Sequence, residues 1–272
     1  MVGDHLVQPI IACIGFPVAG NPTQFVCERT LNAMGLDWGV VTAVVPAEML
    51  EQAVLGARAM RFGGLAVLPP HQEVIATHLD TLSPTSQKTG IVQVVRRMEE
   101  VWYGHDLRAE TLLSWIQKQS LDEHHIALWL SDAKLLEAIQ EIDSSLAKTI
   151  VTLEGWKALS ERMHESNESV GEETQETRNL PDVGCVIVDS GTMDPAEFQK
   201  SKLQWRAQGT VIVADASLHA TAWKKWALDR QWQFLGALDY QSHLIAKMLE
   251  FWTQSEPPVA QIRDLLEEYL EW

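Results

Sequence analysis

The chain has few cysteines, no long apolar run and no recognisable targeting segment. Its 272 residues include three cysteines, Cys13, Cys27 and Cys185, which are widely spaced and form no C-x-x-C pattern. This spacing indicates ordinary reduced thiols and disfavours a disulfide framework. No apolar stretch approaches the roughly 18 residues of a membrane-spanning helix. The N-terminus lacks a basic region followed by an apolar stretch, so it does not resemble a secretory signal. We therefore expect a cytoplasmic protein without a membrane partner.

Basic residues are also scarce. Twenty-one Lys and Arg stand against 37 Asp and Glu, for a formal net charge of −16. Nucleic acids and anionic membrane surfaces are bound by concentrated Lys and Arg, so both classes of partner are excluded. Solubility is a sufficient reason for the acidic excess. The hydrophobic share of 46% supports a packed core, and the length suits one large or two modest domains.

Apolar strand-like segments alternate with helical segments along most of the chain. The predicted strands are 10–17, 38–45, 65–68, 91–96, 126–130, 149–153, 183–188 and 210–214, with a short edge strand at 102–104. The predicted helices are 23–34, 47–60, 71–82, 133–142, 242–253 and 259–272, with a further helix that follows the strand at 149–153 and ends at about residue 163. This alternation is typical of βαβ units and predicts mostly parallel sheets.

Two kinds of residue invite a functional interpretation that we do not favour. His71, His78 and His105 lie near Glu73 and Asp106 in the sequence, but three or four converging ligands are needed for a metal, so we expect no metal site. Trp223, Trp226 and Trp232 are expected to pack a helix and not to stack on a ligand. The polar segment 165–179, rich in Glu, Ser and Thr, is expected to be an insertion or loop.

Two stretches resemble an enzyme's substrate-site motifs with the reactive groups replaced. The first is Gly-Leu-Ala-Val-Leu-Pro-Pro-His-Gln-Glu at 64–73, and the second is Gly-His-Asp-Leu-Arg-Ala-Glu at 104–110. Both are similar to the G-x-N-V-T-x-P-x-K and G-x-N-T-D-G motifs of shikimate dehydrogenases. The resemblance places the family's catalytic Lys at Gln72 and its partner Asp at Arg108. Neither side chain exchanges a proton near neutral pH.

Three further segments extend the resemblance in the same order along the chain. The stretch 14–23 resembles the family's opening motif, in which two serines bind the substrate carboxylate, and these positions are Asn21 and Thr23. Asn21 and Thr23 can bind an anion or can form only a turn and helix cap, and both interpretations stay open. The substrate-binding Asn falls on Gln93, and the C-terminal Gln falls on Leu244, or on His243 in a second alignment.

The resemblance implies an α/β fold with two domains. Residues 1–108 are expected to form a substrate-binding domain of the shikimate dehydrogenase type. Residues 109–240 are expected to form a Rossmann-like, doubly wound domain, and residues 241–272 to form helices that pack back toward the cleft. A small-molecule ligand is then expected in the interdomain cleft, lined by Asn21, Thr23, Gln72, Gln93 and Arg108. A homodimer is an open option.

The cofactor motifs depart from the family pattern. After the strand at 126–130 the chain has Ser131, Asp132 and Ala133, without the glycines that let backbone N–H groups approach a pyrophosphate. Glu154 lies where the NADP enzymes carry an Arg for the 2′-phosphate. We therefore expect no cofactor-binding residues and no cofactor.

These departures leave three hypotheses for function. The leading one is a homologue that has lost NADP-dependent shikimate oxidation and acts as a small-molecule-binding or regulatory protein. The alternative is a divergent, active shikimate or quinate dehydrogenase that uses NAD or NADP and takes a proton acceptor such as His71 or His105. The third is an interaction module whose cleft is empty. Arg108 fits either a pocket residue that pairs with an anionic ligand or a surface residue.

Overall fold

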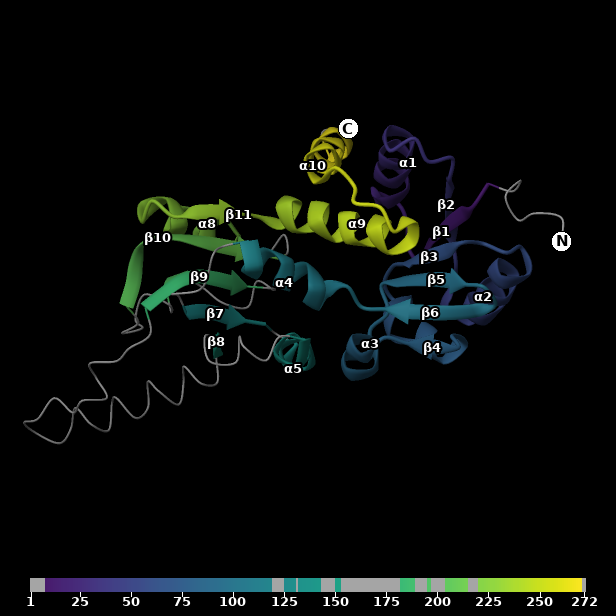
Figure 1. Cartoon of the computed structure of the whole chain (residues 1–272), viewed down its shortest axis with the longest axis horizontal. Helices are drawn as coiled ribbons and strands as arrows, with labels where there is room; N and C mark the ends of the chain where they lie inside the picture. Colours follow the sequence, from purple (N-terminus) through teal and green to yellow (C-terminus); the bar gives the residue numbers. More distant parts are fainter. Residues whose placement is uncertain are drawn as a thin grey trace, which may run out of the picture. The chain divides into compact units, whose positions relative to one another are not determined.

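The structure is a computed structural model that describes residues 8–118, 125–130, 132–142, 150–152, 182–188, 195–196, 204–214 and 220–270. The chain divides into two compact units, each with its own sheet (Figure 1). The N-terminal unit comprises Met1–Thr111 and Gln241–Trp272, and the central unit comprises Leu112–Tyr240. The predicted two-domain α/β architecture is thus confirmed. The C-terminal helical segment is part of the N-terminal unit.

The sheet of the N-terminal unit has the order β2-β1-β3-β5-β6-β4. Its strands are β1 (Ile10–Gly15), β2 (Gly39–Val44), β3 (Gly64–Val67), β4 (Thr81–Leu82), β5 (Val94–Met98) and β6 (Val101–His105). β1 pairs in parallel with β2 and β3, and β4 pairs in parallel with β6. β5 is antiparallel to both of its neighbours, β3 and β6. A tight hairpin, with Glu99 at φ 57°, joins β5 to β6. β6 therefore lies inside the sheet, and the prediction of an edge strand there was wrong.

Besides the first turn of α4 (Arg108–Lys118), eight described helical elements belong wholly or partly to this unit. They are α1 (Thr23–Ala33), η2 (Ala47–Met49), α2 (Leu50–Ala59), η3 (His71–Glu73), η4 (Ile75–His78), α3 (Pro84–Thr89), α9 (Ala237–Thr253) and α10 (Val259–Leu270). In the described chain, α9 begins in the central unit and enters the N-terminal unit at Gln241. α10 lies beside α1, where Arg29 pairs with Glu268 and the Phe25 ring contacts Tyr269 (Figure 1).

The predicted helix 71–82 is replaced by two short 3₁₀ turns and strand β4. The backbone N–H groups of Asp80 and Ser83 donate to the carbonyls of Trp102 and Gly104 on β6. Pairing with β6 therefore takes the hydrogen bonds that a helix would need at this point. The turn predicted at 83–84 is the start of α3, where the Ser83 hydroxyl accepts from the Ser86 N–H and Pro84 occupies the first turn.

The core of the N-terminal unit is a layer of apolar side chains between the sheet and α2. It includes Ile14, Leu65, Val95 and Trp102, all less than 4% exposed. On α9, Trp252 is 3% exposed, and its indole Nε1–H donates to the carbonyl of Val95 at 3.0 Å. This contact is close because residue 64 is glycine. A Cβ there would lie 2.6 Å from Trp252 Nε1 and closer still to the Val95 oxygen.

The central unit contains five described strands that all pair in parallel. They are β7 (His125–Trp129), β8 (Ile150–Thr152), β9 (Asp182–Val188), β10 (Gln204–Val213) and β11 (Gln233–Leu235), in the order β11-β10-β9-β7-β8. Its helices are α5 (Ala133–Ile142), α8 (Ala220–Asp229) and the greater part of α4 (Arg108–Lys118). The strand order is that of a doubly wound sheet, with its switch point between β7 and β9.

Three tryptophans of the central unit pack against this sheet and its helix, as predicted. Trp223, Trp226 and Trp232 are at most 3% exposed and belong to one hydrophobic cluster with the strands. The rings of Trp226 and Trp232 meet edge to face, with centroids 5.5 Å apart. Such pairs stabilise beyond their buried area, so this cluster fixes α8 on the sheet.

The cysteines are free and buried. Burial raises the pKa of the Cys13 and Cys185 thiols to about 12. A thiol is a poor nucleophile under that condition, so these groups act as small core side chains. Among the described helices, none is long and apolar enough to cross a membrane. The helix predicted after residue 153, the segment 165–179, Ser131 and Glu154 lie outside the described residues.

The contact between Gly64 and Trp252 predicts an unusually damaging alanine substitution. Gly64→Ala would force β5 or α9 to move, and we expect a loss of about 2 kcal/mol or more in the free energy of unfolding. The control is Gly56→Ala in α2, where a Cβ would meet only the end of Met60 at 4.0 Å. We expect that variant to be neutral or stabilised by about 0.5 to 1 kcal/mol. Urea unfolding of both variants tests the comparison, and equal stability would contradict it.

Candidate functional site

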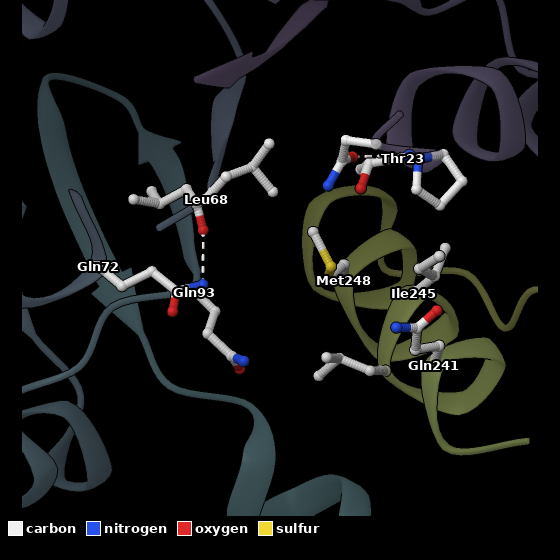
Figure 2. Close-up of a pocket in the computed structure, with 11 residues that line it drawn as sticks. Thr23, Leu68, Gln72, Gln93, Gln241, Ile245 and Met248 are labelled. Atoms are coloured by element: carbon white, nitrogen blue, oxygen red, sulfur yellow. Dashed lines mark hydrogen bonds between the residues drawn. The ribbon is translucent and has the colours of Figure 1, made fainter. Parts of the chain in front are cut away.

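A pocket of about 580 Å³, which includes space open to solvent, lies within the N-terminal unit. Its eleven lining residues come from the loop before α1, the end of β3, η3, the approach to β5, and α9 (Figure 2). They are Asn21, Pro22, Thr23, Val67, Leu68, Gln72, Gln93, Gln241, Leu244, Ile245 and Met248. The pocket therefore brings together Asn21, Thr23, Gln72, Gln93 and Leu244, five of the six residues that the sequence suggested for ligand binding.

The side chain of Gln72 is held in one orientation by the backbone. Its amide nitrogen donates to the carbonyl of Val67 at 2.8 Å, the bond drawn as a dashed line in Figure 2. A carbonyl can only accept, so the Gln72 NH₂ group must face Val67. The Oε1 atom is then the group left for a ligand. Gln72 consequently presents a hydrogen-bond acceptor, whereas a Lys at this position would present a donor.

Gln93 and Asn21 are oriented the opposite way. The Gln93 Oε1 atom accepts from the Leu107 N–H at 3.2 Å, and the Asn21 Oδ1 atom accepts from the Thr23 N–H at 3.0 Å. A backbone N–H can only donate, so each amide must turn its oxygen toward the backbone and its NH₂ group outward. The Asn21 contact also supports the turn-and-cap interpretation at the start of α1. A role of Asn21 in ligand binding stays open, because its NH₂ group is not used in this contact.

Helix α9 supplies the other wall of the pocket. Gln241, Leu244, Ile245 and Met248 follow the i, i+3, i+4, i+7 spacing of one helix face. Sequence comparison pointed to Leu244 and missed Gln241, although Gln241 lies one turn earlier on the same face. That turn displaces the amide by about 4.5 Å along the helix axis. Figure 2 shows Gln241 and Met248 across the pocket from Gln72 and Gln93.

None of the eleven lining residues is ionisable. His71 is 1% exposed, and its Nε2 atom lies 2.7 Å from the Val45 carbonyl, so this nitrogen must donate there. His105 lies 2.9 Å from the Glu110 carboxylate through its Nε2 atom. Neither histidine belongs to the lining. The structure therefore shows no acid or base among the side chains that line the pocket.

Arg108 is the sixth suggested residue, and it lies outside the lining. Its guanidinium pairs with Asp106, with the Nη2 and Oδ2 atoms 2.8 Å apart. Asp106 is fully buried and also accepts from the Thr89 hydroxyl at 2.8 Å. The pair joins the start of α4 to α3, so Arg108 has a structural role that the motif comparison did not indicate.

At the switch point of the central sheet, the start of α5 is capped by its own chain. The Asp132 Oδ1 atom accepts from the N–H groups of Lys134 at 3.0 Å and Leu135 at 3.2 Å. Asp132 thus acts as the predicted helix cap. A dinucleotide pyrophosphate normally takes these N–H groups, and Asp132 places a carboxylate at the same end of the helix.

Residues 13–95 match the family model described as the shikimate dehydrogenase substrate binding domain. The sequence similarity to this family therefore lies in the N-terminal unit. The chain is 34% identical over 101 residues to the shikimate dehydrogenase (NADP(+)) of Geobacter metallireducens, a match that covers 37% of this chain and 35% of that enzyme. It is 33% identical over 116 residues to the Bacillus licheniformis enzyme of the same name, covering 43% and 41%. The matches thus span well under half of these relatives.

Similarity of fold extends over nearly the whole chain. A shikimate 5-dehydrogenase from Thermus thermophilus, solved with shikimate, superposes with a TM-score of 0.65 and 17% identity, covering 97% of this chain and all of that one. The 5-ketofructose reductase of a Gluconobacter species superposes with a TM-score of 0.63 and 16% identity, covering 97% and 99%. These likenesses confirm the shikimate dehydrogenase fold for both units. They also show that the fold accommodates more than one substrate.

The Asp106–Arg108 pair predicts a large effect on stability. Arg108→Met would leave a fully buried carboxylate without its cation, and we expect a loss of about 3 to 5 kcal/mol in the free energy of unfolding. In the control, Arg29→Met breaks the exposed pair with Glu268 and is expected to cost less than about 1 kcal/mol. Chemical denaturation measures both. Combining Arg108→Met with Asp106→Asn should recover part of the loss. Equal losses of unfolding free energy in Arg108→Met and Arg29→Met would refute the structural role of Arg108.

Proposed function

We propose that the pocket of the N-terminal unit binds a small hydroxylated ligand of the shikimate type, and that the protein does not oxidise it. The observation that carries this proposal is the uncharged lining of the pocket. Proton transfer by a positioned acid or base is worth roughly 10²- to 10⁴-fold in rate. An amide at position 72 forms hydrogen bonds and cannot supply that step.

The remaining polar groups suit recognition. Asn21 and Gln93 present NH₂ donors, Thr23 carries a hydroxyl, and Gln72 presents an oxygen acceptor. Leu244, Ile245 and Met248 contribute an apolar wall. A ring with several hydroxyl groups has donors and acceptors for the amides and a carbon face for the wall. The same scaffold can therefore hold a substrate-like ligand without a catalytic group.

The capped start of α5 supports the absence of a nicotinamide cofactor. Asp132 already accepts from the N–H groups at this helix terminus. A diphosphate would meet a carboxylate there and would have to displace it. Coulomb repulsion between the two anions would weaken dinucleotide binding.

A second candidate is a divergent dehydrogenase that uses NADP or NAD. The comparisons favour it more directly than they favour a loss of activity, because the curated relatives are named shikimate dehydrogenase (NADP(+)). In this chain the substrate hydroxyl would have to give its proton to water or to a group outside the lining, such as His71 or His105. A double alanine variant of these two histidines would test that route in any active preparation.

Calorimetry and a turnover assay separate the two candidates. Shikimate is titrated into the purified chain with and without NADP or NAD, and reduced cofactor is followed by absorbance at neutral pH. Binding of shikimate without cofactor binding and without turnover is the expected result. Cofactor reduction that depends on shikimate would overturn the proposed loss of oxidation and establish the dehydrogenase. Absence of shikimate binding would reject this ligand class for the pocket.

The role of Gln241 gives a matched pair of variants. Gln241→Leu removes the amide that faces the pocket from α9 and is expected to weaken shikimate binding about three- to tenfold, the loss of one neutral hydrogen bond. Gln52→Leu makes the same chemical change at an exposed position of α2 that does not line the pocket. It should leave the dissociation constant unchanged. Equal affinities of the two variants would show that Gln241 does not contact the ligand.

A further inference from the structure

A second cavity of the N-terminal unit, which we call the α9 groove, has a volume of about 720 Å³ including space open to solvent. It is lined by Arg96, Leu107, Glu110, Lys247, Glu250, Phe251 and Gln254. None of these residues lines the pocket described above. Both cavities use α9, but through different sides of the helix. The groove is therefore a separate feature with a charged lining.

Arg96 is the arginine of this groove, and apart from the neighbouring Arg97, which donates to the Glu99 carbonyl, the other arginines of the unit are paired with carboxylates. Arg29, Arg58 and Arg61 pair with Glu268, Asp80 and Glu100, respectively. Arg108 and Arg263 pair with Asp106 and Glu267. Within the part of the chain that the structure describes, the half-buried Arg96 has no carboxylate partner. An unpaired guanidinium is conspicuous in a chain with a net charge of −16.

The acidic residues of the groove have other partners. The Glu110 carboxylate lies 2.9 Å from His105 Nε2, and the Glu250 carboxylate lies 2.8 Å from Lys247 Nζ. The hydrogen bond with His105 holds the pKa of Glu110 below its usual value. Glu110 is therefore ionised at neutral pH and is held by the histidine. Arg96 remains the cation whose fork of N–H donors is available to a ligand.

An aromatic and aliphatic wall lies beside these charges. Phe251 stacks on His105, with ring centroids 5.4 Å apart and an interplanar angle of 26°. It also contacts Tyr103 at 6.1 Å. Arg96 pairs directly with Tyr103 across the β5–β6 ladder, so the two side chains share one face of the sheet. Arg96 and the Phe251 wall therefore belong to the same side of the sheet.

We propose that the α9 groove binds a small carboxylate with an apolar body. The carboxylate would take two parallel hydrogen bonds from the Arg96 guanidinium, a geometry in which Arg is particularly effective. The apolar body would lie against Phe251 and Leu107. Glu110 offers a second oxygen to an ammonium group, so both a simple carboxylic acid and an α-amino acid fit this chemistry. The inference does not depend on the function proposed for the pocket.

Titration calorimetry on the full chain tests the proposal with three probes. All three probes contain a phenyl ring. Phenylacetate adds a carboxylate, phenylalanine adds a carboxylate and an ammonium group, and benzyl alcohol carries no charge. At least one of the two carboxylates should bind in the millimolar range, and benzyl alcohol should bind more weakly. Tighter binding of phenylalanine would identify an amino acid as the ligand type, and tighter binding of phenylacetate would identify a simple acid. Binding of neither carboxylate would overturn the proposal.

Two neighbouring arginines provide the matched variants. Arg96→Gln should weaken binding of the carboxylate about tenfold or more, because a charge-assisted pair is lost. Arg97→Gln alters the next residue of β5, which points to the opposite face and, among the described residues, donates to the Glu99 carbonyl. It should leave binding unchanged. Equal effects of the two variants would overturn the assignment to Arg96.

A third variant separates the groove from the pocket. Gln241→Leu alters the pocket alone and should retain carboxylate binding. If Gln241→Leu abolished binding while Arg96→Gln preserved it, the carboxylate would belong in the pocket and the proposal would fail. Thermal unfolding of each variant establishes that it is folded. Phe251→Leu should weaken the phenyl probes while leaving the Arg96 side chain in place.

Discussion

The attachment of α9 to the sheet is the constraint on which both cavities depend. Trp252 donates its indole N–H to the Val95 carbonyl, and the absence of a side chain at Gly64 permits this approach. The same helix gives Gln241 and Met248 to the pocket and Lys247 and Phe251 to the groove. A small shift of α9 would therefore change both cavities. This explains why residues remote from the N-terminal motifs belong to the same unit.

The two cavities differ in how they can select a ligand. The pocket has amides whose orientation is set by backbone partners, at Asn21, Gln72 and Gln93. Its donors and acceptors are therefore fixed before a ligand arrives, and such preorganisation favours affinity. In the groove, charged groups are half-exposed and ion pairs compete with solvent, so a single unpaired guanidinium is the main attraction. Recognition should thus be directional in the pocket and mainly electrostatic in the groove.

The sequence predicted the fold better than the site. The alternation of apolar and amphipathic segments predicted the α/β class, and the family resemblance supplied the division into two domains. The helix expected at 71–82 failed because pairing of Asp80 and Ser83 with β6 is a tertiary contact that no local pattern reveals. Arg108 was placed in the site by its motif position, but its partner Asp106 lies two residues away, and sequence spacing does not show which charge is buried. Gln241 could have been found from helical periodicity, since it lies three residues before Leu244.

Family resemblance and side-chain chemistry lead to different expectations for activity, and the difference can be traced to particular residues. The sequence resemblance covers residues 13–95, and the likeness of fold extends over nearly the whole chain. In this chain the Val67 carbonyl accepts from the Gln72 amide and fixes its orientation. A Lys at position 72 could gain or lose a proton, whereas the Gln72 amide is neutral and its NH₂ group already donates to the Val67 carbonyl. A fold can therefore be kept while the chemistry of its site changes, because shape resides in the backbone and reactivity in a few side chains.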